Sequence, residues 1–233
     1  MLHGSTPAML LAREVERFQS GHPMFVARLT LELLRPVGLV PLTTRSRLLR
    51  PGRKVELVEA SLMAGEVEVV RATALRIRHQ EIQLPDLAPE PPPHLPEELP
   101  VWNSSAYGEQ VAYHTAGVEM RIPEAQANSL GPAFAWVRLK LPVVPGEQPS
   151  PLVRICAAAD FGNGISNVVN PRQFLYINPD LTIHVHRLPA GQWVGIDAVT
   201  WLQAHGTGMA EGRLWDQTGP LGRSVQSLLV EPR

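Results

Sequence analysis

Charged residues and cysteine are both scarce in this sequence. Only 18% of its 233 residues are charged, below the share of about a quarter that is usual in globular proteins. The 21 lysines and arginines nearly balance the 22 aspartates and glutamates, which leaves a net charge of −1. This balance gives no reason to expect nucleic acid or an anionic membrane as a partner.

Cysteine occurs only once, at Cys156, so the chain cannot form an internal disulfide. A lone thiol fits a reducing compartment, and we expect the protein to be cytoplasmic. Cys156 lies in the apolar run RICAAAD. Because free cysteine is among the most buried residue types, a buried structural thiol is favoured over a catalytic nucleophile.

Long apolar runs and several catalytic signatures are also missing. No stretch of 18 apolar residues exists, so we expect no membrane span, and no signal peptide is visible. The sequence contains no phosphate-binding loop, dinucleotide fingerprint or G-x-S-x-G elbow. Asp160-Phe161-Gly162 spells a protein-kinase motif without its partner motifs. His184 and His186 share one strand face but lack further ligands, so we expect no metal and no cofactor.

The first half of the chain predicts one helix followed by strands. Residues 8–18 carry apolar side chains at helical spacing, and Ser5 or Thr6 is a candidate N-cap. Alternating apolar residues, separated by glycine or proline, then predict an antiparallel meander. Its strands cover residues 24–36, 39–52, 53–65 and 66–78.

Proline dominates the middle of the chain. Residues 84–100 hold seven prolines in seventeen positions, which no packed element tolerates. The composition predicts an exposed, partly stiff linker of polyproline type. A ligand for an SH3-type domain is the less favoured alternative.

The second half repeats the plan of the first. Ser150-Pro151 opens a helix that runs to about Asp160, and alternation predicts strands at residues 109–122, 133–143, 173–188, 193–204, 207–216 and 222–231. A helix followed by a meander, twice, indicates a duplicated α+β unit. We expect domains at residues 1–83 and 105–233, a linker at 84–104, and a first domain without the strand that would precede its helix.

Several segments resemble the TesB-like acyl-CoA thioesterases. In the first half they are LHGSTPAMLLAR and RLLRPGRKVELVEA. In the second half they are AAADFGNGIS, FLYINPDLTIHVHRLPAGQWVGIDA, GTGMAEGRLWDQTGPLGR and SVQSLLVE. The resemblance implies an α+β double hotdog, in which two antiparallel curled sheets each wrap around a long helix. His3-Gly4-Ser5 resembles the turn that leads into the first helix of this family.

The resemblance also implies three site residues, which in this family hold a water for attack on the thioester. Asp160 matches an aspartate at the end of the second helix, and Gln226 matches a glutamine on the last strand. The family's threonine falls on Asn178, which is a departure. An asparagine amide can also donate to or accept from a water, but it is longer and planar.

Each of the three residues has a simpler interpretation. Asp160 could be a solvated helix end, although a carboxylate there opposes the helix dipole. Asn178 precedes Pro179-Asp180 in a common turn pattern. Gln226 could be an exposed strand residue. If SVQS aligns with RATALR, Gln226 matches Ala74, and the first half lacks its polar partner.

The expected function is hydrolysis of an acyl-CoA substrate by a homo-oligomer, a dimer of double hotdogs. One alternative is a catalytically silent hotdog that binds acyl-CoA or acts as a scaffold. Another is a hotdog dehydratase or hydratase, which needs a histidine and an aspartate paired on the central helix of the hotdog, and the second helix carries no histidine. The cations Arg45, Arg47, Arg50, Arg53 and Lys54 could meet CoA phosphates, or could form a solvated hairpin.

Overall fold

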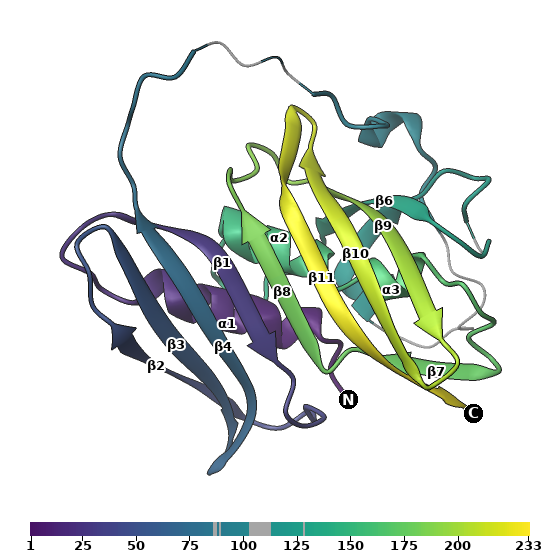
Figure 1. Ribbon diagram of the computed structural model, residues 1–233, viewed down its shortest axis with the longest axis horizontal. Coiled ribbons are helices and arrows are strands. Elements are labelled where there is room, and N and C mark those ends of the chain that lie inside the picture. Colours follow the sequence, from purple (N-terminus) through teal and green to yellow (C-terminus); the bar gives the residue numbers. More distant parts are fainter. Residues whose placement is uncertain (86–87, 89, 103–112, 128) are drawn as a thin grey trace.

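The protein is built around one large antiparallel sheet with helices on one face (Figure 1). The computed structural model describes all residues except 86, 87, 89, 103–112 and 128. Its helices are α1 (Ser5–Arg17), α2 (Pro151–Ala159) and α3 (Gly162–Ile165), with a one-turn 3-10 helix η1 (Pro96–Glu98) and a π turn η3 (Tyr113–Gly117). None of the helices in the described residues is long and apolar enough to cross a membrane.

Eleven strands form the sheet. They are β1 (Met24–Glu32), β2 (Leu42–Arg50), β3 (Val55–Ala64), β4 (Val67–Arg78), β5 (Val118–Arg121), β6 (Ala133–Leu139), β7 (Phe174–Ile177), β8 (Asp180–Val185), β9 (Val194–Gln203), β10 (Thr207–Asp216) and β11 (Gly219–Pro232). Their order is β2-β3-β4-β1-β8-β11-β10-β9-β6-β5, and β7 pairs with the end of β11. Strands β2, β3 and β4 form the predicted antiparallel meander, whereas β1 pairs with β4 rather than with β2.

The two halves meet at strands β1 and β8. These strands pair antiparallel with Thr30 opposite Thr182, so the two curled sheets join into one. Figure 1 shows α1 and α2 on the same face of this sheet, α1 behind the first-half strands and α2 behind the second-half strands. The expected double hotdog is confirmed, with the addition that its two sheets are continuous.

The core lies between the helices and the sheet. Leu11 and Val15 of α1, and Ile155 and Cys156 of α2, are fully buried, and the two helices pack against each other. Burial raises the pKa of the Cys156 thiol well above its ordinary value. The prediction of a buried structural thiol is therefore confirmed.

The start of α1 differs from the prediction. Ser5 is already helical, and Gly4 occupies the N-cap position without a side-chain cap. The Ser5 hydroxyl instead donates to the carbonyl of Ala157, 3.1 Å away in α2. The predicted cap is wrong because this hydroxyl joins the two helices rather than ending one of them.

Two predicted strands are interrupted. The segment 173–188 forms β7 and β8, which pair with different parts of β11 and break at Asn178-Pro179. Proline has no N–H to donate to a ladder, which accounts for the break. Of the predicted strand 109–122, residues 109–112 lie outside the described residues, residues 113–117 form η3, and only Val118–Arg121 is strand.

The proline-rich segment is only partly exposed. Residues 90–93 are largely exposed, but Pro96 and Leu99 are buried. Leu99 packs with Phe134, Trp136 and Trp215 in a small second core, and the indole N–H of Trp136 donates to the carbonyl of His94. The prediction of an exposed linker is wrong for residues 94–99. This segment is partly buried because it packs over aromatic side chains that point outward from the second half of the sheet.

Candidate active site

Asp160 directly follows α2 and takes its C-cap position. The chain does not leave the core there, because Gly162 begins the short helix α3 and the connection stays tight. Asp160 is only 5% exposed. The interpretation of Asp160 as a solvated helix end is therefore wrong.

Asn178 and Gln226 both reach the Asp160 carboxylate. The side-chain amide of Asn178 donates to Asp160 Oδ1 over 3.0 Å, and that of Gln226 donates to the same oxygen over 3.1 Å. The three residues matched to the family's site thus converge on one carboxylate oxygen. They come from a helix end, a strand break and the last strand, 18 and 66 positions from Asp160 in the sequence.

The break at Asn178-Pro179 frees the Asn178 side chain to turn inward. Its amide also donates to the backbone carbonyl of Asp180 over 3.1 Å, as expected for an asparagine in a turn. The turn interpretation therefore holds for Asn178, and the same amide also reaches the Asp160 carboxylate.

Gln226 faces the helices from the inner side of β11 and is 1% exposed, so the exposed-strand interpretation is wrong. Its oxygen accepts from the backbone N–H of Asn163 over 3.2 Å, which fixes which way round its amide lies. A Cβ at Gly162 would approach this oxygen to 3.0 Å. The glycine after Asp160-Phe161 therefore gives the glutamine room.

His3 also reaches the Asp160 carboxylate, and the sequence analysis gave it no role. Its Nδ1 lies 3.0 Å from Asp160 Oδ2, the oxygen that the amides leave free. The backbone N–H of Ser5 also points at Nδ1, over 3.2 Å. With its hydrogen on Nδ1 the ring donates to Asp160, whereas with its hydrogen on Nε2 the Nδ1 atom accepts from Ser5, so the two contacts belong to different tautomers.

Gly4 allows the first half of the chain to approach the carboxylate. A Cβ at this position would lie 2.7 Å from Asp160 Oδ2, which is closer than atoms can pack. The His-Gly pair ahead of the first helix was the available sequence signal for this contact. Its partner lies more than 150 residues away in the sequence, so the pair alone could not reveal the contact.

Aromatic rings cover the His3 side of the site. The His3 ring lies 5.0 Å from the ring of Tyr113 and 4.9 Å from that of Phe161, and the Tyr113 and Phe161 rings stack at 5.9 Å. Burial raises the pKa of Tyr113 well above its usual range, so its hydroxyl stays neutral. These rings shield the carboxylate and the imidazole from bulk water on this side.

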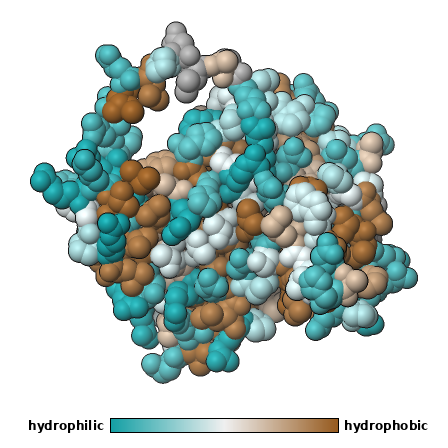
Figure 2. Space-filling view, in the orientation of Figure 1, coloured by the Kyte–Doolittle hydropathy of each residue, from teal (hydrophilic) through white to brown (hydrophobic). Residues whose placement is uncertain are grey.

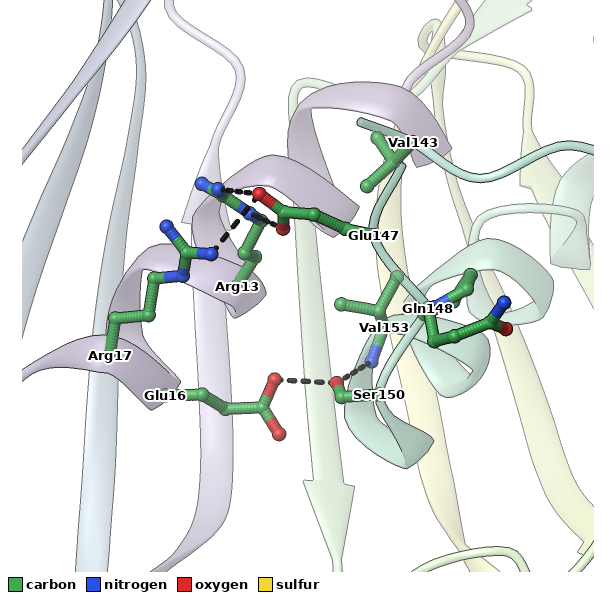
Figure 3. Close-up of a pocket in the computed structure, with 9 residues that line it drawn as sticks. Arg13, Glu16, Arg17, Val143, Glu147, Gln148, Ser150 and Val153 are labelled. Atoms are coloured by element: carbon green, nitrogen blue, oxygen red, sulfur yellow. Dashed lines mark hydrogen bonds and ion pairs between the residues drawn. The ribbon is translucent and has the colours of Figure 1, made fainter. Parts of the chain in front are cut away.

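A separate pocket of about 320 Å³ lies between the second half of α1 and the residues that lead into α2 (Figure 3). The Glu147 carboxylate bridges Arg13 and Arg17, and the Ser150 hydroxyl donates to Glu16. None of the four site residues lines this pocket. Both arginines pair with Glu147 and Glu16 accepts from Ser150, so we interpret these residues as a structural contact between α1 and the segment before α2.

The described part of the chain contains no group of three or more histidine, cysteine or acidic side chains arranged to hold a metal. What the site offers is a buried carboxylate with two amides on one oxygen and an imidazole beside the other. Such a set can position a small polar molecule and move a proton.

Comparison with known proteins identifies the relatives of the chain. Residues 1–77 match the model of the acyl-CoA thioesterase N-terminal domain, and residues 85–230 match that of the acyl-CoA thioesterase C-terminal domain. No functionally curated protein matches the sequence.

Solved structures share the fold at low sequence identity. An acyl-CoA thioesterase II from Mycobacterium marinum is 16% identical with a TM-score of 0.71, over 100% of this chain and 91% of that one. A hot dog fold protein of unknown function from Alicyclobacillus acidocaldarius is 15% identical with a TM-score of 0.75, over 98% and 86%. The dehydratase domain of PpsC from Mycobacterium tuberculosis is 15% identical with a TM-score of 0.52, over 99% and 85%.

The two family models together span nearly the whole chain, in the order that a double hotdog requires. The protein therefore belongs to the acyl-CoA thioesterase family.

Proposed function

We propose that the protein hydrolyses an acyl-CoA thioester to a free acid and CoA, and that Asp160, Asn178 and Gln226 activate the attacking water. The observation that carries this proposal is the convergence of both amides on one oxygen of a buried carboxylate. Hydrolysis of a thioester needs a base that also orients water, and neighbours that hold the water in place.

In this mechanism a water sits beside the Asp160 carboxylate and gives up a proton to it as its oxygen attacks the thioester carbonyl carbon. The tetrahedral intermediate then collapses, the carbon–sulfur bond breaks, and the CoA thiolate takes up the proton. Asn178 and Gln226 hold the carboxylate and the water in position for this attack. No step requires a metal or an organic cofactor.

His3 fits this scheme as a residue that orients the carboxylate. Its contact with Oδ2 fixes the plane of the carboxylate while the amides hold Oδ1.

A second candidate function follows from the same contact. The dehydratase interpretation required a histidine–aspartate pair on the central helix, and here His3 supplies a histidine beside Asp160 from the segment before α1 instead. Such a pair could remove the α-proton of a 3-hydroxyacyl thioester and protonate the departing hydroxyl, which gives a 2-enoyl thioester and water.

One experiment separates these functions from a silent acyl-CoA-binding protein. Purified protein is given a panel of acyl-CoAs while free thiol is measured, and 3-hydroxyacyl-CoAs while enoyl absorbance is measured. We expect thiol release that is lost in Asp160→Asn. Enoyl formation without thiol release would favour the dehydratase. Binding with neither product would favour the silent protein and contradict the proposal.

A further inference from the structure

The outer face of the sheet, which faces away from the helices, differs between the two halves of the chain. Over the second half, residues 94–99 cover the aromatic residues of β6 and β10. Over the first half, none of the described residues forms such a cover, and apolar side chains on β3 and β4 point outward beside the core. Figure 2 shows an apolar area at the left of this face, with hydrophilic side chains around it.

Strand register defines the composition of this area. Val55 lies opposite Ile77, and Leu57 opposite Leu75. Their sequence neighbours Glu56, Val58, Ala74 and Arg76 are buried on the helix side, so alternation turns these four apolar side chains outward. Ile77 is 43% exposed, and none of the four packs in the main core cluster.

Cations surround these apolar side chains. Arg28 lies opposite Leu75 on one flank, and Arg50 opposite Leu57 on the other. Arg53 and Lys54 are exposed in the turn that leads into Val55, at the end of these strands, where Arg53 also lines a pocket beside Phe18 and Glu56. We call these eight residues the basic–apolar patch: Arg28, Arg50, Arg53, Lys54, Val55, Leu57, Leu75 and Ile77.

The cations of the patch are free of acidic partners. None of the four forms an ion pair with any described residue, in contrast to Arg47 and Arg71, which pair with Glu59 and Glu68 in the next rows of the same sheet face. The nearby Glu56 points inward, is 6% exposed, and is paired with Arg76. The patch therefore carries uncompensated positive charge around an apolar centre.

We propose that the basic–apolar patch docks the protein on an anionic lipid surface. A flat sheet face with apolar side chains at its centre can enter the interface between head groups and acyl chains, while arginine and lysine extend to the phosphates. Binding of this kind is peripheral and needs no membrane-spanning helix. The docking surface is independent of the catalytic residues, which lie on the other face of the sheet.

A second copy of the chain fits the patch less well. In a twofold-symmetric contact the same patch occurs on both subunits, so the four cations would face their own copies across the interface. Nucleic acid would match the charge but not the apolar centre. An anionic bilayer supplies both the acidic groups and the apolar layer.

Co-sedimentation with vesicles tests the proposal. Vesicles of phosphatidylcholine alone are compared with vesicles that also contain phosphatidylglycerol. We expect binding only to the anionic vesicles, and weaker binding at high salt. The double variant Arg53→Gln, Lys54→Gln should lower the partition coefficient on the order of 30-fold, since each cation near an anionic surface contributes about a 5-fold increase. Ile77→Ser should weaken binding through its apolar contact.

The matched control removes two positive charges elsewhere, with Arg45→Gln on the mixed-charge part of the face and Arg172→Gln in the second half. It should leave binding within about 2-fold, and all variants should keep the wild-type unfolding temperature. Failure of the wild type to bind anionic vesicles, equal binding to neutral ones, or equal loss in the control would overturn the proposal. So would a dimer that dissociates in Ile77→Ser while vesicle binding is unchanged.

Discussion

At the residue scale the account depends on Asp160. It is a buried carboxylate with one oxygen held by two amides and the other next to an imidazole. Replacing it with asparagine keeps the shape and removes the base. We expect kcat for thioester hydrolysis to fall by about 10²–10⁴, measured by thiol release.

Asp197→Asn is the control for this variant. It makes the same chemical change at an exposed position on the outer side of β9, so its activity should match the wild type. Wild-type activity in Asp160→Asn would contradict the assigned role.

Asn178 allows a test of the departure from the family pattern. Its amide N–H donates to Asp160, and a threonine hydroxyl can do the same. We expect Asn178→Thr to retain activity within about 10-fold, and Asn178→Ala to lose more, because alanine cannot donate. Equal activity in the two variants would show that the donor at this position does not matter.

Cys156 should be chemically silent in the folded protein. It is fully buried, and burial raises the pKa of its thiol, so little thiolate is present to react. A thiol reagent should modify it only after unfolding, with the rate followed by absorbance. Fast modification of the native protein would show that the core around α2 opens readily.

At the element scale the two halves are related through the paired strands β1 and β8. Thr30 lies opposite Thr73 on one side and opposite Thr182 on the other, and Thr182 lies opposite Val225. The pseudo-twofold relation therefore matches Thr73 to Val225 and Ala74 to Gln226. This register agrees with the sequence alignment of SVQS with RATALR, and it places a buried alanine where the second half has its glutamine.

The same relation matches the helix ends. Phe18 is the C-cap residue of α1, as Asp160 is of α2. The first half thus has neither the carboxylate nor the glutamine at its corresponding end. We predict one active site per chain. Calorimetric titration of Asp160→Asn with a non-hydrolysable acyl-CoA thioether should give one site per chain at the catalytic affinity, and two equal sites would contradict this.

The turn between β10 and β11 depends on a second buried aspartate. Asp216 is 2% exposed and accepts from both terminal nitrogens of Arg187, from the hydroxyl and N–H of Thr218, and from the N–H of Ala190. Asp216→Ala should lower the free energy of unfolding by about 3 kcal/mol, measured by denaturant unfolding. Glu211→Ala, in an exposed pair with Arg223, should cost less than about 1 kcal/mol.

Acid should weaken this turn in a defined direction. The hydrogen bonds from Arg187, Thr218 and Ala190 outweigh burial and hold the pKa of Asp216 well below its ordinary value, which is about 3.9 in unfolded chains. The stability it contributes is therefore present above about pH 4 and is lost as the pH falls toward the folded-state pKa. The unfolding free energy of wild type should drop more steeply below pH 4 than that of Asp216→Asn. Parallel curves would contradict the assignment.

Local sequence was sufficient for much of the element scale. Strand alternation and helical spacing indicated most elements within a few residues, and the family resemblance pointed to Asp160, Asn178 and Gln226, whose side chains the fold brings together. His3 and the break between β7 and β8 were missed, because both depend on contacts between segments distant in the sequence. Period-2 patterns also cannot show which outward-facing aromatic residues a segment elsewhere in the chain will cover, as residues 94–99 cover Trp136.

At the scale of the whole molecule, the continuous sheet was not foreseen. Nothing local in β1 or β8 shows that these strands pair with each other rather than form edges. The division at residues 83/84 and 104/105 and the dimer of double hotdogs stay predictions. Sedimentation velocity at several protein concentrations would measure the oligomeric state directly.

Net charge was also a poor guide at this scale. A total of −1 gave no reason to expect an anionic partner, yet the sheet register places the unpaired cations Arg28 and Arg50 beside an apolar centre on one face, and two more unpaired cations lie in the adjacent turn. Opposite charges elsewhere in the molecule hide this asymmetry in the sum. The vesicle experiment tests whether the local positive charge of the basic–apolar patch, rather than the net charge, determines binding.

The central claim is that a water held by Asp160 attacks the thioester directly. Single-turnover hydrolysis in ¹⁸O-labelled water, followed by mass spectrometry of the acid and of the protein, tests it most directly. The account predicts that ¹⁸O enters the released acid and that no label enters the protein. Label in the Asp160 carboxylate would reveal a covalent acyl-enzyme instead, and would contradict the proposed role of this residue.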